Sequence, residues 1–168
     1  MGESKLIIDL RSEAELIDSA GAMGRAWWAA KCSPLVIGLR GDLGAGKTTW
    51  ARALLRGLGH SGRVPSPTYT LLEQYSVGGL VVVHLDLYRL ANETELENLG
   101  LRDWLEEPAT WVLVEWPERA PHLEARCDLL LEIADVGADA RRIVIRGETR
   151  AGIDALQEIG QVRFNNRR

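Results

Sequence analysis

The ten-residue stretch GDLGAGKTTW, residues 41–50, constrains the fold of this chain more than any other part of its 168 residues. Its glycines, lysine and threonine match the Gly-x-x-x-x-Gly-Lys-Thr spacing of a phosphate-binding loop. Such a loop joins a buried strand to a helix, because the backbone N–H groups of the turn and the helix N-terminus both point at phosphate. The apolar run at 34–39 predicts that strand, and residues 48–59 predict the helix. The sequence therefore predicts a nucleotide site where they meet.

The side chains of this loop suit different parts of a nucleoside triphosphate. Lys47 supplies a mobile cation for the β- and γ-phosphates, the Thr48 hydroxyl is placed to bind Mg²⁺, and Thr49 can donate toward the α-phosphate. The glycines let the backbone turn sharply enough to direct its N–H groups inward. The residues predicted to bind the nucleotide here are Gly41, Asp42, Leu43, Gly44, Ala45, Gly46, Lys47, Thr48 and Thr49.

Two carboxylates follow apolar runs and are candidates for the acidic side of the site. Asp86 ends the run LVVVHLD, and Glu115 ends WVLVE. The carboxyl ends of strands are where α/β folds place their ligands, so both side chains are expected beside the loop. One would hold Mg²⁺ directly or through water and the other would orient the attacking water, and the sequence leaves the assignment open. Together with Lys47, they are the predicted catalytic residues.

The segment SPTYT, residues 66–70, lies between the loop and Asp86 and has two interpretations of equal weight. Its hydroxyls suit a switch that senses the γ-phosphate, and its prolines suit an ordinary turn that enters a strand. His84 is interpreted as a packed strand residue rather than a base. Arg89 is expected to pair with a carboxylate, with a phosphate contact as the alternative.

The rest of the chain predicts an α/β fold in one domain over residues 1–168. The class expected is a three-layer, P-loop NTPase-like fold with a mixed, mostly parallel central sheet and a β-hairpin inserted after the loop helix. The tail at 161–168 is expected to be flexible. Strands are predicted at 5–10, 34–39, 110–116, 128–135 and 141–148, a hairpin around Gly78-Gly79, and helices from Ser12 to about Ala30 and over 93–107 with a break at Gly100, while 152–160 is ambiguous.

The charge balance and cysteine content limit the partners and the compartment. A net charge of −4 argues against strong direct binding to free nucleic acid. The chain is rich in arginine from Arg141 onward, which favours a solvated terminus over a docking patch for an acidic partner or RNA. Cys32 and Cys127 form no CxxC pair, which fits a reducing cytoplasm. No apolar run predicts a signal peptide or a membrane span.

Five blocks of the sequence, in this order and spacing, resemble the TsaE (formerly YjeE) family of bacterial P-loop ATPases: GDLGAGKTT, SPTYTL, HLDLYRL, ELENLGL and VEWPER. HLDLYRL and VEWPER are far more specific than the loop. The resemblance implies a role in forming N6-threonylcarbamoyladenosine beside the anticodon of tRNAs that read codons starting with A. It implies binding to the TsaD–TsaB complex, which transfers the group and which ATP hydrolysis keeps turning over, so that tRNA is met only indirectly.

The resemblance also implies residue roles around the phosphates. Residues 44–49 would hold phosphates, and Thr48 and Glu115 would hold Mg²⁺. Asp86 would be the second acidic group of the site.

Further positions matched by the resemblance lie around the nucleotide. Thr68 would make a switch-like contact, and Trp116 would lie near the nucleotide or the partner. Ser12 or Glu13 would approach the adenine or ribose, and Arg141 would line the same side.

Three other functions are considered. A small P-loop kinase needs an acceptor pocket and usually an arginine-rich lid, and the stretch RGLGHSGR, with Arg56 and Arg63, could be mistaken for one. A GTPase switch needs an NKxD-type guanine reader, and the nearest stretch, ANETE, lacks the lysine. The third alternative is a non-catalytic interaction module that responds to bound nucleotide. It differs from the TsaE-like function only in whether ATP hydrolysis matters.

Overall fold

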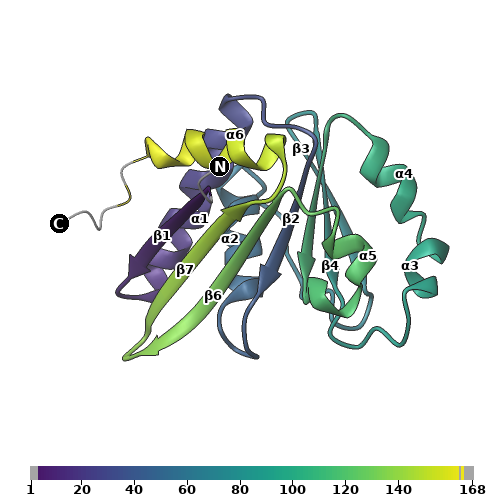
Figure 1. The fold of residues 1–168 in the computed structure, drawn as a ribbon, viewed down its shortest axis with the longest axis horizontal. Coiled ribbons are helices and arrows are strands. Elements are labelled where there is room, and N and C mark those ends of the chain that lie inside the picture. The colour runs from purple at the N-terminus through teal and green to yellow at the C-terminus, as the bar shows by residue number, and fades with distance from the viewer. Residues whose placement is uncertain (1–3, 163, 165–168) are drawn as a thin grey trace.

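A seven-stranded sheet runs through the centre of the molecule and carries helices on both faces (Figure 1). This computed structural model describes residues 4–162 and residue 164. The strand order is β1-β7-β6-β2-β5-β4-β3. The strands are β1 (Lys5–Leu10), β2 (Leu35–Arg40), β3 (Leu72–Val77), β4 (Leu80–Asp86), β5 (Thr110–Glu115), β6 (Leu129–Gly137) and β7 (Ala140–Gly147). The helices are α1 (Glu13–Ala29), α2 (Lys47–Gly57), α3 (Thr94–Asn98), α4 (Leu101–Glu106), α5 (Pro121–Glu124), α6 (Arg150–Gly160) and the 3₁₀ helix η1 (Pro117–Arg119).

The centre of the sheet is parallel and its two flanks are antiparallel. The neighbours β6, β2, β5 and β4 all run in the same direction. The strand β3 pairs antiparallel with β4 through the turn at Gly78-Gly79, and β7 and β1 complete the other flank in antiparallel pairing. The predicted mixed α/β fold with a hairpin after the loop helix is confirmed. Because β2, β5 and β4 are parallel, their carboxyl ends lie at the same edge of the sheet.

Alternation along the strands supplies two hydrophobic cores, one on each face of the sheet. In β2, Leu35, Ile37 and Leu39 pack with α1, α2 and α6, whereas Val36 packs in the second core with residues of α3, α4 and α5. Successive side chains of a strand point to opposite faces, so a strand buried on both sides is apolar throughout. Helices therefore pack on both faces of β2 and β5, and this packing fixes the position of the loop that follows β2.

The predicted helix starts and strand ends agree with the structure apart from small shifts. Ser12 caps α1, since its hydroxyl accepts a 3.2 Å hydrogen bond from the backbone N–H of Glu15. The segment left ambiguous at 152–160 is helix α6, which Thr149 caps through the backbone N–H of Gly152 at 3.1 Å. The strand predicted to end at 116 ends one residue earlier, because Trp116 adopts a left-handed conformation with φ of 60°.

Two expectations concern the chain end and membranes. Of the tail predicted to be flexible, 161–168, only residues 161, 162 and 164 are described, so that prediction lies mainly outside the described residues. In the described part of the chain, no helix has both the length and the apolar character that a membrane crossing requires.

Candidate nucleotide-binding site

The phosphate-binding loop joins β2 to α2, and two of its glycines are required by geometry. Gly41 has a φ of 151°, and a Cβ there would lie 2.4 Å from the carbonyl oxygen of Ile133 on β6. Gly46 has a φ of 117° and precedes the first residue of α2, where an added Cβ would lie 2.9 Å from Leu16 Cδ2 of α1. A side chain at either position would both strain the backbone and collide with a neighbour. The loop is therefore held tightly between β6 and α1.

Lys47 folds back over this loop as the first residue of α2. Its ammonium Nζ donates to the carbonyl oxygens of Gly41, at 2.6 Å, and Asp42, at 2.9 Å, and lies 4.2 Å from the centroid of the Trp116 ring. Burial lowers the pKa of Lys47, whereas the nearby carboxylates, Glu115 first among them, raise it. The ammonium group therefore lies against the loop and beside the N-terminus of α2, where a bound anion is favoured.

Arg141 supports the loop from the side of β7. Its Nε donates to the carbonyl oxygen of Ala45 at 2.9 Å, and its guanidinium lies 3.4 Å from Asp135. The family resemblance implied that Arg141 lines the adenine or ribose side of the nucleotide. The structure brings it to the loop backbone, and its contact with the adenine or ribose side stays a prediction.

Glu115 is buried at the end of β5 and has a partner on each carboxylate oxygen. The hydroxyl of Thr48 donates to Oε1 at 2.7 Å, and Nε2 of His84 lies 2.6 Å from Oε2. The Glu115 residue is 2% exposed. Thr48 and Glu115, both expected to hold Mg²⁺, thus lie in direct contact, and their binding of the metal stays a prediction.

Asp86 lies beside Glu115 because the two are cross-strand partners in the parallel pairing of β4 and β5. Its Oδ2 accepts from the Thr68 hydroxyl at 3.0 Å, and its Oδ1 accepts from the backbone N–H of Tyr88 at 3.0 Å. The Thr68 hydroxyl in turn lies 2.7 Å from that of Ser66. The segment 66–70 is thereby tied to the acidic edge of the sheet, and it also forms a turn that leads into β3, so the structure fits both the switch and the turn interpretation.

These groups line one pocket of about 380 Å³. The predicted residues on its wall are Leu43, Gly44, Gly46, Lys47, Thr48, Thr49, Thr68, Asp86, Glu115 and Trp116. Gly41, Asp42, Ala45 and Arg141 support the loop without lining the pocket. A set of residues spread over more than 70 positions of sequence thus converges on one cavity.

Ser12 and Glu13 lie at the start of α1 and do not line this pocket. The Ser12 hydroxyl is already used as the helix cap. The first turn of α1 is nevertheless close to the loop, since Leu16 approaches the Cβ position of Gly46. The predicted contact of Ser12 or Glu13 with adenine or ribose stays a prediction.

Three residues contribute to the site beyond the predicted set, although a phosphate contact was already the alternative for Arg89. His84 is packed in the strand as expected, but it also contacts Glu115. Tyr88 lines the pocket and lies 5.0 Å, between ring centroids, from Trp116. Arg89 also lines the pocket, and its guanidinium lies 4.8 Å from the Tyr69 ring centroid; the ion pairs of the described residues do not include it. All three belong to the block HLDLYRL, which was the available signal.

The donor atoms of this pocket fit Mg²⁺. Thr48, Glu115 and Asp86 offer only oxygen, the ligand type that Mg²⁺ prefers, and two carboxylates leave room for phosphate and water. Among the described residues, no group of three or more His, Cys, Asp and Glu side chains could form a closed metal site. The set therefore suits a metal shared with a nucleotide rather than a cation held by protein alone.

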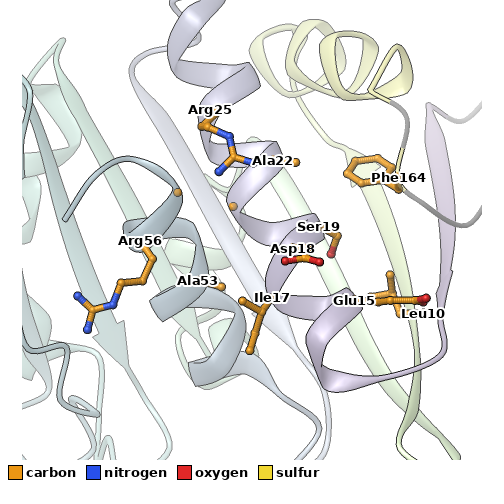
Figure 2. Close-up of a pocket in the computed structure, with 12 residues that line it drawn as sticks. Leu10, Glu15, Ile17, Asp18, Ser19, Ala22, Arg25, Ala53, Arg56 and Phe164 are labelled. Carbon is orange, nitrogen blue, oxygen red and sulfur yellow. The ribbon is translucent and has the colours of Figure 1, made fainter. Parts of the chain in front are cut away.

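A second and slightly larger pocket, of about 410 Å³, lies along α1 (Figure 2). Its wall combines α1 and α2 with Phe164, and it includes Asp18, Arg25 and Arg56. The floor is made where the helices cross closely, since a Cβ on Gly57 would lie 2.4 Å from Gly21 Cα. None of the predicted site residues lines it. Chemistry rather than size therefore identifies the loop pocket as the candidate site.

Comparison with known proteins agrees with this geometry. The crystal structure of Bacillus subtilis YdiB matches with a TM-score of 0.74 and 26% identity, covering 96% of this chain and 97% of that one. A Haemophilus influenzae protein named tRNA threonylcarbamoyladenosine biosynthesis protein TsaE is 45% identical over 118 residues, 70% of this chain and 73% of the relative. The Synechocystis protein of the same name is 47% identical over 94 residues, which span 59% of its length.

The family model described as threonylcarbamoyl adenosine biosynthesis protein TsaE matches residues 10–143. That range contains the loop, both carboxylates and the block HLDLYRL. The chain belongs to the TsaE family.

Proposed function

We propose that this protein is a Mg²⁺-dependent ATPase that serves the formation of N6-threonylcarbamoyladenosine in tRNA as an accessory to the TsaD–TsaB complex. The observation that carries the proposal is the hydrogen bond from Thr48 to Glu115, which closes the phosphate-binding loop onto an acidic strand end in one pocket. Membership of the TsaE family supports the role in tRNA modification.

The phosphate chain is bound by the loop and by Lys47. The ammonium that now donates to the Gly41 and Asp42 carbonyls is close enough to the pocket to donate to phosphate oxygens instead. The N-terminus of α2 adds the partial positive charge of its free N–H groups. Thr49, on the same wall, is a donor for the α-phosphate side.

Thr48, Glu115 and Asp86 would hold Mg²⁺ when the nucleotide is bound. The ion would neutralise charge on the β- and γ-phosphates as the terminal bond breaks. Glu115 keeps Thr48 oriented through Oε1, while Asp86 remains linked to the 66–70 segment through Thr68. One of the two carboxylates would orient the attacking water.

Hydrolysis is expected to be slow in the isolated protein and faster in the complex. A partner can order the 66–70 segment and the exposed Tyr69, which is 84% accessible, around the γ-phosphate. The net charge of −4 is consistent with meeting tRNA through TsaD–TsaB rather than directly.

The experiment that tests the proposal is ATP hydrolysis by the protein alone and with TsaD–TsaB added, in Mg²⁺, with GTP as the control nucleotide. Strong stimulation of ATP hydrolysis by the partners is expected. Full activity without a partner effect, a preference for GTP, or phosphate transfer to a metabolite would each contradict the proposal.

A further inference from the structure

His84 occupies a position where the sheet otherwise has apolar side chains. It lies on β4 on the same face as Leu80 and Val82, and all three are buried against the core that includes α1 and α2. Its exposed fraction is 0%. If the side chain only filled space here, an apolar residue would stabilise the fold more, since a buried polar group costs free energy unless it is paired. The imidazole therefore calls for an explanation in its contacts.

Strand register brings His84 to Glu115. His84 is the cross-strand partner of Leu113, and Glu115 is two residues further along β5, on the same face. This diagonal relation is within reach of long side chains, and Nε2 of His84 lies 2.6 Å from Oε2 of Glu115. The contact thus depends on the β4–β5 pairing and would be lost with a one-residue slip.

The surroundings of the ring assign its tautomer. A carboxylate accepts hydrogen bonds, so Nε2 must carry the proton that Glu115 Oε2 accepts. The other ring nitrogen, Nδ1, is buried and has no hydrogen-bond partner among the described groups. The contact with Glu115 is therefore the hydrogen bond that orients the ring. His84 is therefore a fixed donor to Glu115.

The two partners of Glu115 act on different oxygens. Thr48 donates to Oε1 and His84 to Oε2, from opposite sides of the same carboxylate. A carboxylate bonded at one oxygen can still rotate, whereas one bonded at both is confined to a single orientation. Hydrogen bonds to metal-binding groups from neighbouring residues orient those groups and tune their affinity.

We propose that His84 is a positioning residue for the Mg²⁺ site: its Nε2–H holds Glu115 so that the carboxylate and the Thr48 hydroxyl face the pocket together. The inference rests on the proposed function, because it assumes that Glu115 serves a nucleotide-bound Mg²⁺. It predicts that losing the donor weakens the response to Mg²⁺ and leaves metal-free nucleotide binding intact.

The test is calorimetric titration of ADP at increasing Mg²⁺ and in EDTA, for the full chain and four variants. His84→Leu removes the donor, His84→Asn keeps polarity but is too short to reach Glu115, and His84→Gln places an amide N–H near the position of Nε2. Val82→Ala, on the same strand and face, controls for general loss of core packing. Thermal unfolding of each variant identifies those that fold.

We expect His84→Leu and His84→Asn to raise the Mg²⁺ concentration for half-maximal tightening by about tenfold or more, with ADP affinity in EDTA unchanged. His84→Gln should recover most of the wild-type response, and Val82→Ala should keep it. An unchanged Mg²⁺ midpoint in either donor-free variant that folds, or equal behaviour of Gln and Asn, would overturn the inference. If the wild type shows no Mg²⁺-dependent ADP binding, the proposed function fails instead.

Discussion

The pocket has two walls that are built differently. The β5 wall consists of Lys47, Thr48 and Glu115, which lie in α2 or in β5, and the buried His84 of β4 contacts Glu115 from behind. The loop wall consists of Thr68, Asp86 and Tyr88, of which only Asp86 belongs to a strand, and Ser66 contacts the Thr68 hydroxyl. Each wall contributes one carboxylate, at 2% exposure for Glu115 and 5% for Asp86.

The difference lies in what holds each carboxylate. Glu115 is hydrogen-bonded to Thr48 in helix α2 and to His84 in strand β4. Asp86 is hydrogen-bonded to the Thr68 hydroxyl in an irregular segment and to the backbone N–H of Tyr88, two residues after its strand ends. Segments without regular structure open at lower free energy than packed strands and helices. The β5 wall is therefore suited to bind nucleotide and metal in a fixed geometry. The loop wall is suited to change conformation when nucleotide or a partner binds.

The largest expected effect comes from removing the cation of the β5 wall. Lys47→Ala should weaken ADP and ATP binding by about 100-fold or more, because charged hydrogen bonds to two phosphates are lost. Calorimetry measures this, with Lys5→Ala on the exposed side of β1 as the control. Retained nucleotide affinity would mean that the β5 wall is not where phosphate binds.

The next effect separates binding from hydrolysis at Glu115. Glu115→Ala should leave nucleotide binding measurable and reduce partner-stimulated ATP hydrolysis by about 100-fold, since a positioned carboxylate is lost from the reacting site. Glu106→Ala, exposed at the end of α4 and outside the pocket lining, is the matched control. Normal hydrolysis by Glu115→Ala would remove Glu115 from the catalytic residues.

Asp86 tests the loop wall in the same way. Asp86→Asn keeps an acceptor for Thr68 but removes the charge, so turnover in Mg²⁺ should fall by roughly 30-fold while affinity in EDTA changes little. Steady-state hydrolysis and metal-free titration give the two quantities. Equal loss in both would assign Asp86 a structural role and would erase the proposed difference between the walls.

Local sequence signals identified most elements and the centre of the site. The Gly-Lys-Thr spacing, the apolar runs before Asp86 and Glu115, and the Ser12 cap each act within a few residues, so they are visible without a partner strand. The ambiguous C-terminal helix carried a usable pattern, because Ala155, Leu156 and Ile159 form its buried face. Its flanking glycines obscured that periodicity.

Contacts that depend on register were not accessible from the sequence. The pairing of β1 with β7 joins residues such as Ile7 and Val144, and no local pattern indicates it. The same holds for His84, whose burial could be inferred but whose partner follows from the β4–β5 alignment. Arg89 was expected in an ion pair, with a phosphate contact as the alternative, and it lines the pocket with its guanidinium over the Tyr69 ring.

The smallest expected effect concerns the single side-chain bond between Asp86 and the irregular segment. Thr68→Ala removes one donor to Oδ2, so partner-stimulated ATP hydrolysis should fall by about fivefold, the effect of one hydrogen bond of about 1 kcal/mol. Thr68→Ser should restore it, and Thr70→Ala, whose hydroxyl bonds to Glu73 away from the site, should act like wild type. Measured without TsaD–TsaB, the same variants should differ less, because the segment then lacks the partner that orders it. An equal loss with and without the partner would show that Thr68 only supports Asp86 and that the loop wall is as fixed as the β5 wall.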